Sequence, residues 1–347
     1  SSTGGHALTL EGDHLDLGQL VAAGSGTVTL RPRTANRPIA LGSPGDSADH
    51  LALSQEELDR ITAGTLVVGS GEAGTITLES SEVGPSNLTG DWVLHSGGSL
   101  TQSGEGSLSF AGGLRLEIAG AAELGANPNE VDTLAGSIGG PLVFKEAGDL
   151  AVGTVDGDAG IVSGSVALEA QSLTIDDPIQ ATESDGSGID LRGNTLLGAD
   201  LTARGADILL RSPVLTGNNE LFLDTRVPNE TRSGDIIVQS TLDGLNDGEG
   251  ELSLRADYGK IDLQDSVGGQ FSLEQLSTVG RELILPEVTT EGFQDFEVSE
   301  KIMLGGDLTT AGGIINLEGT DSAEATLLPE ADTVTIDSTG NGSVPDG

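Results

Sequence analysis

A short acidic run holds the one local set of side chains in this sequence that could bind a divalent metal. His50 closes a segment that also contains Asp46 and Asp49, so two carboxylates and an imidazole fall within five residues. The other three histidines stand apart, at His6, His14 and His95. None of the four has the His-x-x-x-His spacing of a metal site, which needs three or four converging ligands. We expect surface histidines, with Asp46, Asp49 and His50 as a metal candidate.

Calcium is a second chemistry that the acidic turns could support. Asp185 and Asp190 bound a glycine-rich loop, and residues 246–251 form a similar one. Neither loop has the twelve-residue ligand spacing of an EF-hand, and the calcium-binding nonapeptide of repeat toxins does not recur. We interpret both loops as turns, keep Asp185 and Asp190 as candidates, and expect no dedicated cofactor. Weak calcium binding by the acidic surface stays open.

Polysaccharide cleavage is the enzymatic alternative, because it uses paired carboxylates at a fixed separation or a calcium site beside a base. Asp176 and Asp177 are adjacent but precede Pro178, which favours a turn. Trp92 could be an exposed sugar platform, although a buried anchor fits its strand better. A lyase or glycoside hydrolase would also gather basic residues on one face, with four candidates: Arg204, Arg211, Arg232 and Arg255. We favour a protein that is not an enzyme.

The elements that must position these residues are short strands. Apolar and polar residues alternate over four or five positions between Gly, Asn, Asp and Ser, which is typical of half-buried strands. The pattern recurs at residues 26–30, 74–78, 106–110, 164–168, 207–210, 235–238, 251–254, 313–317 and 333–336. Irregular intervals of roughly 10 to 20 residues indicate a solenoid whose coils bury their apolar faces against one another.

Composition favours one kind of solenoid. With 53 glycines and 2% aromatic residues, the core must consist of aliphatic ladders, and glycine suits corners with positive φ. We predict an all-β, right-handed parallel β-helix of 15 to 18 coils at roughly 20 residues each. We expect one elongated domain over 1–337 and a flexible tail or link over 338–347. Loops are predicted to leave the coil at 41–50, 124–134, 183–188 and 226–234.

The charge balance limits the partners. The sequence has 55 acidic and 15 basic residues, a formal net charge of −40, spread along the chain. Nucleic acid requires clustered Lys and Arg, so we exclude it as a partner. The acidity suits either high salt or an extracellular surface that meets divalent cations.

The sequence also indicates an exported protein. It has no cysteine and no apolar run long enough to span a membrane. Neither end shows the polar cap that solenoids need for solubility. We therefore expect an extracellular or bacterial cell-surface location, with end-to-end self-association or binding to a surface or matrix glycan or protein.

One segment departs from the strand pattern. Ser54 and Glu57 have capping-box spacing, Leu58 and Ile61 are apolar at i and i+3, and Gly64 follows. This pattern predicts a two-turn helix near 54–61, too short to be stable unless it packs on the solenoid.

Residues 51–78 around this helix resemble a repeat of large bacterial surface proteins of the filamentous-haemagglutinin type. The shared phrase is Leu-Ser-x-x-Glu-Leu-Asp-Arg-Ile followed by Ala-Gly-Thr-Leu and a Gly-x-Ile-Thr strand. Those proteins are exoproteins of two-partner secretion systems. The resemblance implies a β-helix, export through an outer-membrane transporter, and a role in adhesion, aggregation or biofilm matrix.

Overall fold

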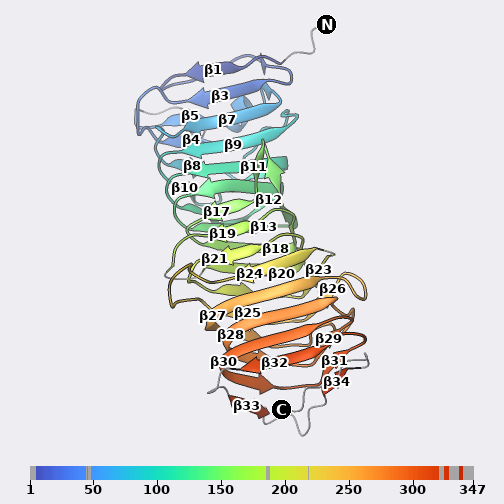
Figure 1. The fold of residues 1–347 in the computed structure, drawn as a ribbon. Coiled ribbons are helices and arrows are strands. Elements are labelled where there is room, and N and C mark those ends of the chain that lie inside the picture. The colour runs from blue at the N-terminus through green and yellow to red at the C-terminus, as the bar shows by residue number, and fades with distance from the viewer. Residues whose placement is uncertain are drawn as a thin grey trace. The chain divides into compact units, whose positions relative to one another are not determined.

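The protein is nearly all β, with parallel strands stacked into a β-solenoid of about 14 turns, which confirms the predicted fold class (Figure 1). The computed structural model describes residues 5–43, 45, 48–184, 188–217, 219–319, 324–327 and 336–338. The turn count is lower than predicted because many turns exceed 20 residues. Val28 pairs with Leu66, 38 residues further along the chain, and Ile208 pairs with Ile236, 28 residues further.

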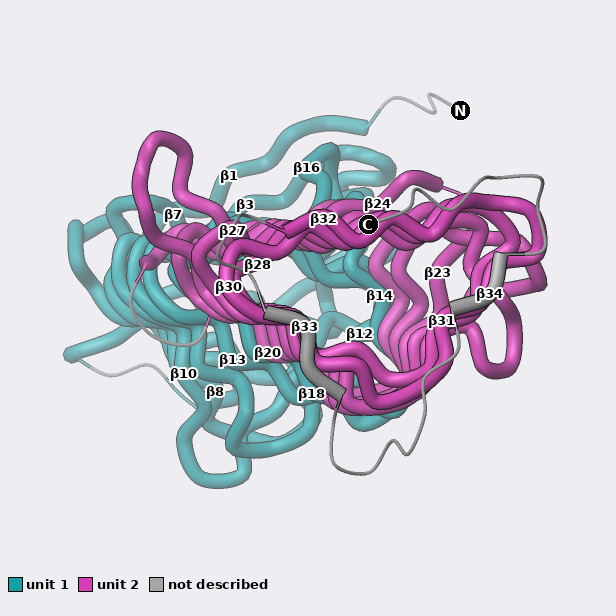
Figure 2. Tube along the Cα trace, turned by 60° about the horizontal axis from the view of Figure 1, so that its bottom comes forward, with its two compact units in different colours: residues 1–171 teal, residues 172–347 magenta. Residues whose placement is uncertain are grey.

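The chain divides into two compact units, residues 1–171 and 172–347, which Figure 2 colours separately. The boundary falls within strand β18 (Val166–Ile175). Each unit is described below by itself.

The first unit has two main columns of parallel strands. One column contains, in order, β1 (Leu8–Glu11), β3 (Thr27–Arg31), β7 (Thr65–Ser70), β9 (Asp91–Ser96), β11 (Ser109–Ile118), the end of β12 (Ala122–Ile138) and β17 (Ile161–Ser163). The other contains β5 (Leu51–Leu53), β4 (Ile39–Leu41), β8 (Ile76–Leu78), β10 (Leu100–Gln102), the start of β12, β13 (Leu142–Glu146) and β18. Shorter pairings involve β2 (Val21–Ala22), β6 (Ile61–Thr62), β14 (Asp149–Val152), β15 (Thr154–Val155) and β16 (Asp158–Ala159).

The second unit has three columns. The first contains β19 (Ile179–Ala181), β21 (Leu201–Ala203), β24 (Glu220–Asp224) and then the starts of β27 (Glu251–Leu263), β28 (Gln275–Leu285) and β30 (Gln294–Leu304), followed by β32 (Ile315–Gly319). The second contains β20 (Ile189–Leu197), β22 (Ile208–Leu210), β25 (Ile236–Val238), the ends of β27, β28 and β30, and β33 (Glu324–Leu327). The third contains β23 (Val214–Thr216), β26 (Leu242–Gly244), β29 (Val288–Thr290), β31 (Leu308–Thr310) and β34 (Ile336–Ser338).

The predicted alternation produces these strands and their core. Segments 26–30, 207–210 and 235–238 become β3, β22 and β25, whereas residues 333–335 lie outside the described residues. Because parallel strands keep their register from turn to turn, inward side chains form ladders. One buried ladder of the second unit contains, in register, Ile208, Ile236, Ile261, Leu283 and Ile302. The predicted aliphatic ladders are therefore confirmed.

The predicted helix exists but is shorter. Helix α1 (Gln55–Leu58) is a single turn, and Ser54 and Glu57 form the predicted capping box. The chain leaves the helix early because Ile61 enters β6 and pairs with Val21 of β2, so Gly64 does not end the helix. A Glu57 carboxylate oxygen also accepts a hydrogen bond from the Leu17 backbone N–H at 3.0 Å, which fastens the helix to the solenoid. Within the described ranges, no helix combines the length and apolar character needed to cross a bilayer.

The predicted loop at 124–134 is wrong, because these residues belong to β12. The strand carries an irregularity between Leu124 and Asn129, where Gly, Asn and Pro residues suggested a break. The fully buried Asn129 amide restores the hydrogen bonds that the bulge disrupts. Its Oδ1 accepts from Leu108 N at 2.9 Å, and its Nδ2 donates to the carbonyls of Leu124 and Lys145, both at 2.9 Å. A buried amide that satisfies three backbone groups lets the strand continue.

The described residues of the other predicted excursions lie between strands, apart from Leu41, which ends β4; residues 44, 46, 47 and 185–187 lie outside the described residues. Residues 42–50 separate β4 from β5, and residues 182–188 separate β19 from β20. The 226–234 segment folds back on itself through an antiparallel bridge between Arg226 and Ser233. Positive φ angles at Gly24 (62°) and Gly104 (61°) confirm that glycine serves corners of the coil.

Trp92 is buried, as the interpretation of its strand predicts. Its ring meets Phe110 edge-on, with centroids 6.0 Å apart and planes at 77°. The single tryptophan of the chain is therefore a probe of the first unit's core.

We expect Asn129→Ala to lower the free energy of unfolding of the first unit by about 3 kcal/mol, because several buried backbone groups lose their partner. Urea unfolding followed by Trp92 fluorescence measures this change. Glu123→Ala, on an exposed position of the same strand, is the control and should change the stability by less than about 0.5 kcal/mol. Equal midpoints for both variants would contradict a structural role for the Asn129 amide.

Candidate functional site

The residues proposed for metal binding are not gathered in the described structure. Asp46 and Asp185 lie outside the described residues. Asp49 and His50 lie just before β5, where the His50 backbone carbonyl accepts a hydrogen bond from Arg37 Nη2 at 3.1 Å. Among the described residues, no three His, Asp or Glu side chains converge as a metal would require.

Asp190 has a different role. It lies in β20, where its Oδ1 accepts from Arg211 Nε at 2.7 Å and its Oδ2 accepts from Arg211 and Arg192, each at 3.0 Å. Burial raises the pKa of this carboxyl, but the two guanidinium partners outweigh burial and hold the pKa below its ordinary value. A cation at Asp190 would have to displace two arginines.

Glu146 and Asp13 are two further carboxylates whose pKa is shifted. Hydrogen bonds from the Thr34 side chain and backbone lower the pKa of Asp13. Burial raises the pKa of Glu146, although the backbone N–H groups of Gly148, Val131 and Ala147 all donate to it. Those three N–H groups belong to the turn after β13 and to β12. Asp190, Glu146 and Asp13 therefore all accept hydrogen bonds from other groups of the chain itself.

The residues considered for polysaccharide cleavage lie in several turns of the second unit. The segments of Arg204 and Arg255 are neighbours, since Gly205 N–H donates to the Thr225 carbonyl and Thr225 N–H donates to the Arg255 carbonyl. Asp176 and Asp177 lie between β18 and β19, as a turn requires. Arg211 pairs with Asp190, and Arg232 Nε lies 3.7 Å from Glu230. Arg204 directly follows β21, and its backbone N–H donates to the Ala181 carbonyl. Arg255 stacks on an aromatic ring of its own unit, as described next.

One outward sheet face of the second unit differs from the rest of the described surface. It comprises β24 and the first parts of β27, β28, β30 and β32, and we call it the aromatic face. Of the described Phe, Tyr and Trp residues, two have large exposed side chains, Phe293 (51% exposed) and Tyr258 (49%). Both border this face, Phe293 just before β30 and Tyr258 where the register of β27 shifts. The half-buried Phe222 lies on β24 of the same face. Exposed rings are costly to hydrate, so their concentration on one face indicates a binding surface.

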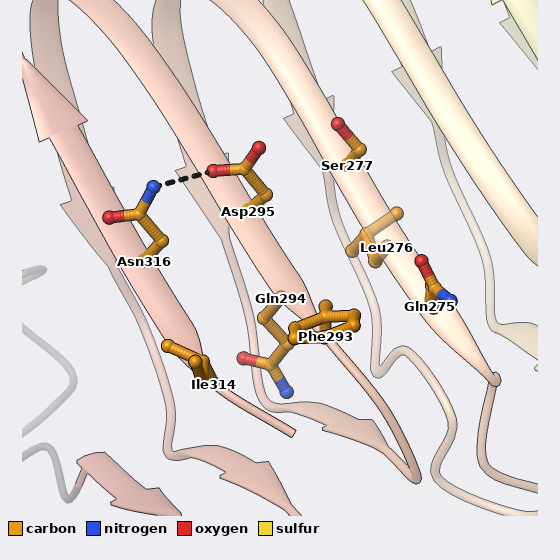
Figure 3. Close-up of a pocket in the computed structure, with 8 residues that line it drawn as sticks. All are labelled: Gln275, Leu276, Ser277, Phe293, Gln294, Asp295, Ile314 and Asn316. Atoms are coloured by element: carbon orange, nitrogen blue, oxygen red, sulfur yellow. Dashed lines mark hydrogen bonds between the residues drawn. The ribbon is translucent and has the colours of Figure 1, made fainter. Parts of the chain in front are cut away.

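The first hollow of this face, the Phe293 hollow, has a volume of about 440 Å³. Figure 3 shows Phe293 and Ile314 at one end of it, with the polar tips of Ser277, Asp295 and Asn316 further along the strands. Asn316 Nδ2 donates to Asp295 Oδ1 at 2.9 Å. The hollow thus combines an apolar end with a row of hydrogen-bonding groups.

The second hollow, the Tyr258 hollow, has a volume of about 330 Å³ and is more acidic. Its lining includes Tyr258 and the carboxylates of Asp257, Glu297 and Glu318. The apolar wall comes from Val279. No Lys, Arg or His of the described chain forms a salt bridge with these three carboxylates; Arg226 is close enough to Asp257 for attraction but is held by Asp224.

Next to the two hollows, the aromatic face includes a cationic side chain of the protein itself, Arg255, which stacks on an aromatic ring of β24. The Arg255 guanidinium carbon lies 4.1 Å above the centre of the Phe222 ring, a cation–π contact. Arg255 Nε also donates to Ser253 Oγ at 3.1 Å.

The sequence pattern pointed to Trp92 as a candidate sugar platform and not to Tyr258 or Phe293. A signal was available, since Phe293 follows Gly292 at the start of a strand and Tyr258 interrupts alternation between Asp257 and Gly259. Both rings therefore occupy positions where a strand bends or begins.

Comparisons with known proteins leave the family open. No protein-family model, curated protein or solved structure matches this chain.

We expect Asp190→Asn to lower the free energy of unfolding at neutral pH by about 2 kcal/mol, because two arginines lose a charged partner. The folded-state pKa is depressed, so this stabilisation is present above the ordinary carboxyl pKa and is lost as the pH falls through the folded value. Urea unfolding followed by circular dichroism should show the two proteins converging as the pH falls below 3.8. The exposed Asp176→Asn is the charge-matched control, and a difference that persists in acid would contradict the ion-pair explanation.

Proposed function

We propose that this chain is a non-enzymatic extracellular structural or adhesive protein, a β-solenoid that presents binding surfaces outside a bacterial cell. The observation that carries the proposal is the aromatic face, where an aromatic-poor chain leaves Tyr258 and Phe293 exposed among acidic and amide groups. Exposed rings beside polar groups are typical of recognition surfaces. The solenoid supports this role because its outward side chains vary while its inward ladders hold the fold.

The chemistry of the acidic groups supports a role without catalysis. Asp190 and Glu146 have shifted pKa values, yet both bond to arginines or backbone amides of the solenoid. A general acid or base would instead face a substrate. We therefore propose that Asp190 stabilises the pairing of neighbouring strands and that Glu146 stabilises the turn after β13.

The resemblance of residues 51–78 supports a cell-surface location. It suggests secretion through an outer-membrane transporter, for which a cysteine-free chain is suited because no disulfide can lock it before export. Within this proposal the partners are a cell-surface or matrix glycan or protein, or further copies of the chain stacked end to end.

We expect the chain, displayed on a non-adherent bacterium, to raise cell–surface attachment or cell–cell aggregation several-fold over cells that display nothing. Purified protein added in solution should compete and reduce this effect. Electron microscopy and light scattering of the purified protein separate the two structural versions, since fibres indicate end-to-end stacking and a monodisperse monomer excludes it.

An activity assay tests the alternative, a polysaccharide lyase or glycoside hydrolase. Incubation with neutral and acidic polysaccharides should release no reducing ends or unsaturated sugars above buffer. Sustained release of either product would overturn the non-enzymatic proposal.

A further inference from the structure

The acidic side of the Tyr258 hollow is organised by the strand register. Val279, Glu297 and Glu318 are direct neighbours on β28, β30 and β32. Adjacent parallel strands lie about 4.8 Å apart, so Glu297 and Glu318 face the same way at close range. Like charges directly opposite one another are destabilising. A bound cation would remove that repulsion.

A bulge brings the aromatic ring to these carboxylates. Register between β27 and β28 shifts after Ala256 and resumes at Lys260, and the extra residues carry Asp257 and Tyr258 outward. Gly259 permits the bend, because a Cβ at this position would lie 2.0 Å from the Gly234 carbonyl oxygen. The bulge therefore places Tyr258 in the same hollow as Glu297 and Glu318.

The same face already has one aromatic ring that binds a guanidinium group. Arg255 lies over Phe222 at 4.1 Å, with Ser253 as its hydrogen-bond acceptor. Tyr258 presents a comparable ring, with carboxylates in place of the hydroxyl and no cation of the described chain salt-bridged to Glu297 or Glu318. A guanidinium from outside would gain both cation–π and charge-assisted hydrogen bonds there.

We propose that the aromatic face binds a basic segment of a partner protein, with an arginine on Tyr258 paired to Glu297 and Glu318. This inference names the partner of the adhesive surface and therefore rests on the proposed function. The choice of a cationic partner follows from charge complementarity, because the chain carries a formal net charge of −40. The same charge disfavours a second copy of this chain as the occupant of this face.

The Phe293 hollow offers the partner segment a second contact, and its distance from the Tyr258 hollow sets the spacing between the two side chains that the partner inserts. Phe293 and Glu297 are four residues apart along β30, so the two hollows are separated by about 13 Å in the strand direction. An extended peptide spans that distance with four residues. The partner segment therefore carries an apolar side chain, for Phe293 and Ile314, four positions from the arginine.

The probe is a fluorescent peptide of otherwise neutral residues with one Arg and one Leu four positions away, titrated with the full chain by anisotropy. The matched peptide carries citrulline, the uncharged analogue, in place of Arg. Binding should weaken at least tenfold with citrulline and should also weaken when salt is raised. Shortening the Arg–Leu spacing by two residues should weaken binding about fivefold.

Variants of the protein locate the site. The double variant Glu297→Gln/Glu318→Gln should lower the affinity about tenfold, and Tyr258→Leu should lower it about threefold to fivefold. The charge-matched control is Glu123→Gln/Glu287→Gln, at exposed positions outside the two hollows, and should change the affinity less than twofold. Thermal unfolding of each variant verifies that the fold is retained.

Three results would overturn the proposal. Equal losses in the control and site variants would mean diffuse attraction to an acidic surface, and undiminished binding of the citrulline peptide would mean that charge is not recognised. A neutral glycan that binds with the same variant profile, while the arginine peptide does not, would also reject it. In that last case adhesion of displayed cells would persist, so failure of this inference is distinguishable from failure of the proposed function.

Discussion

Parallel register between successive turns is the constraint on which every other feature depends. When one strand aligns with the next, backbone hydrogen bonds are satisfied and identical positions of each turn fall above one another. The ladder Ile208, Ile236, Ile261, Leu283 and Ile302 follows directly from that alignment. The same alignment stacks outward residues, so it builds the aromatic face as well as the core. The buried ladders and the rows of outward side chains therefore both result from the same strand register.

Local departures from the strand pattern are stabilised by single polar side chains. In β12, the buried Asn129 substitutes for backbone partners where the chain bulges, and near α1 the half-buried Glu57 carboxylate accepts from both Ser54 and Leu17. Loss of the Asn129 amide is costly, because the backbone atoms that it satisfies are buried from water. The solenoid therefore repeats the same aliphatic stacking in its ladders, whereas each irregular segment is stabilised by its own polar side chain.

The sequence predicts the fold class, many of the strands, the capping box of α1 and the burial of Trp92, because each depends on local alternation or local spacing. The sequence-based prediction fails where the structure of a segment depends on a residue from another turn of the solenoid. Residues 124–134 looked like a loop because the bonds from Asn129 to Leu108 and Lys145 join different turns. The sequence keeps Asp190 as a calcium candidate because one of its two arginine partners, Arg211, lies one turn away, although the other, Arg192, is only two residues along the chain. Tyr258 and Phe293 could not be assigned to one face without the register of four strands.

Turn length varies while the ladders do not. Successive partners are 18 residues apart between Leu276 and Gln294 and 38 apart between Val28 and Leu66, yet both pairs keep their alignment. Additional residues therefore leave at the corners and return to the same register. For a solenoid this makes insertion and deletion at corners, such as the 226–234 excursion, a route to new surface chemistry that leaves the buried framework unchanged. Related solenoids would therefore differ mostly in the lengths and sequences of their corner loops. An alignment that matches strand to strand would detect such relatives even where the spacing between strands has changed.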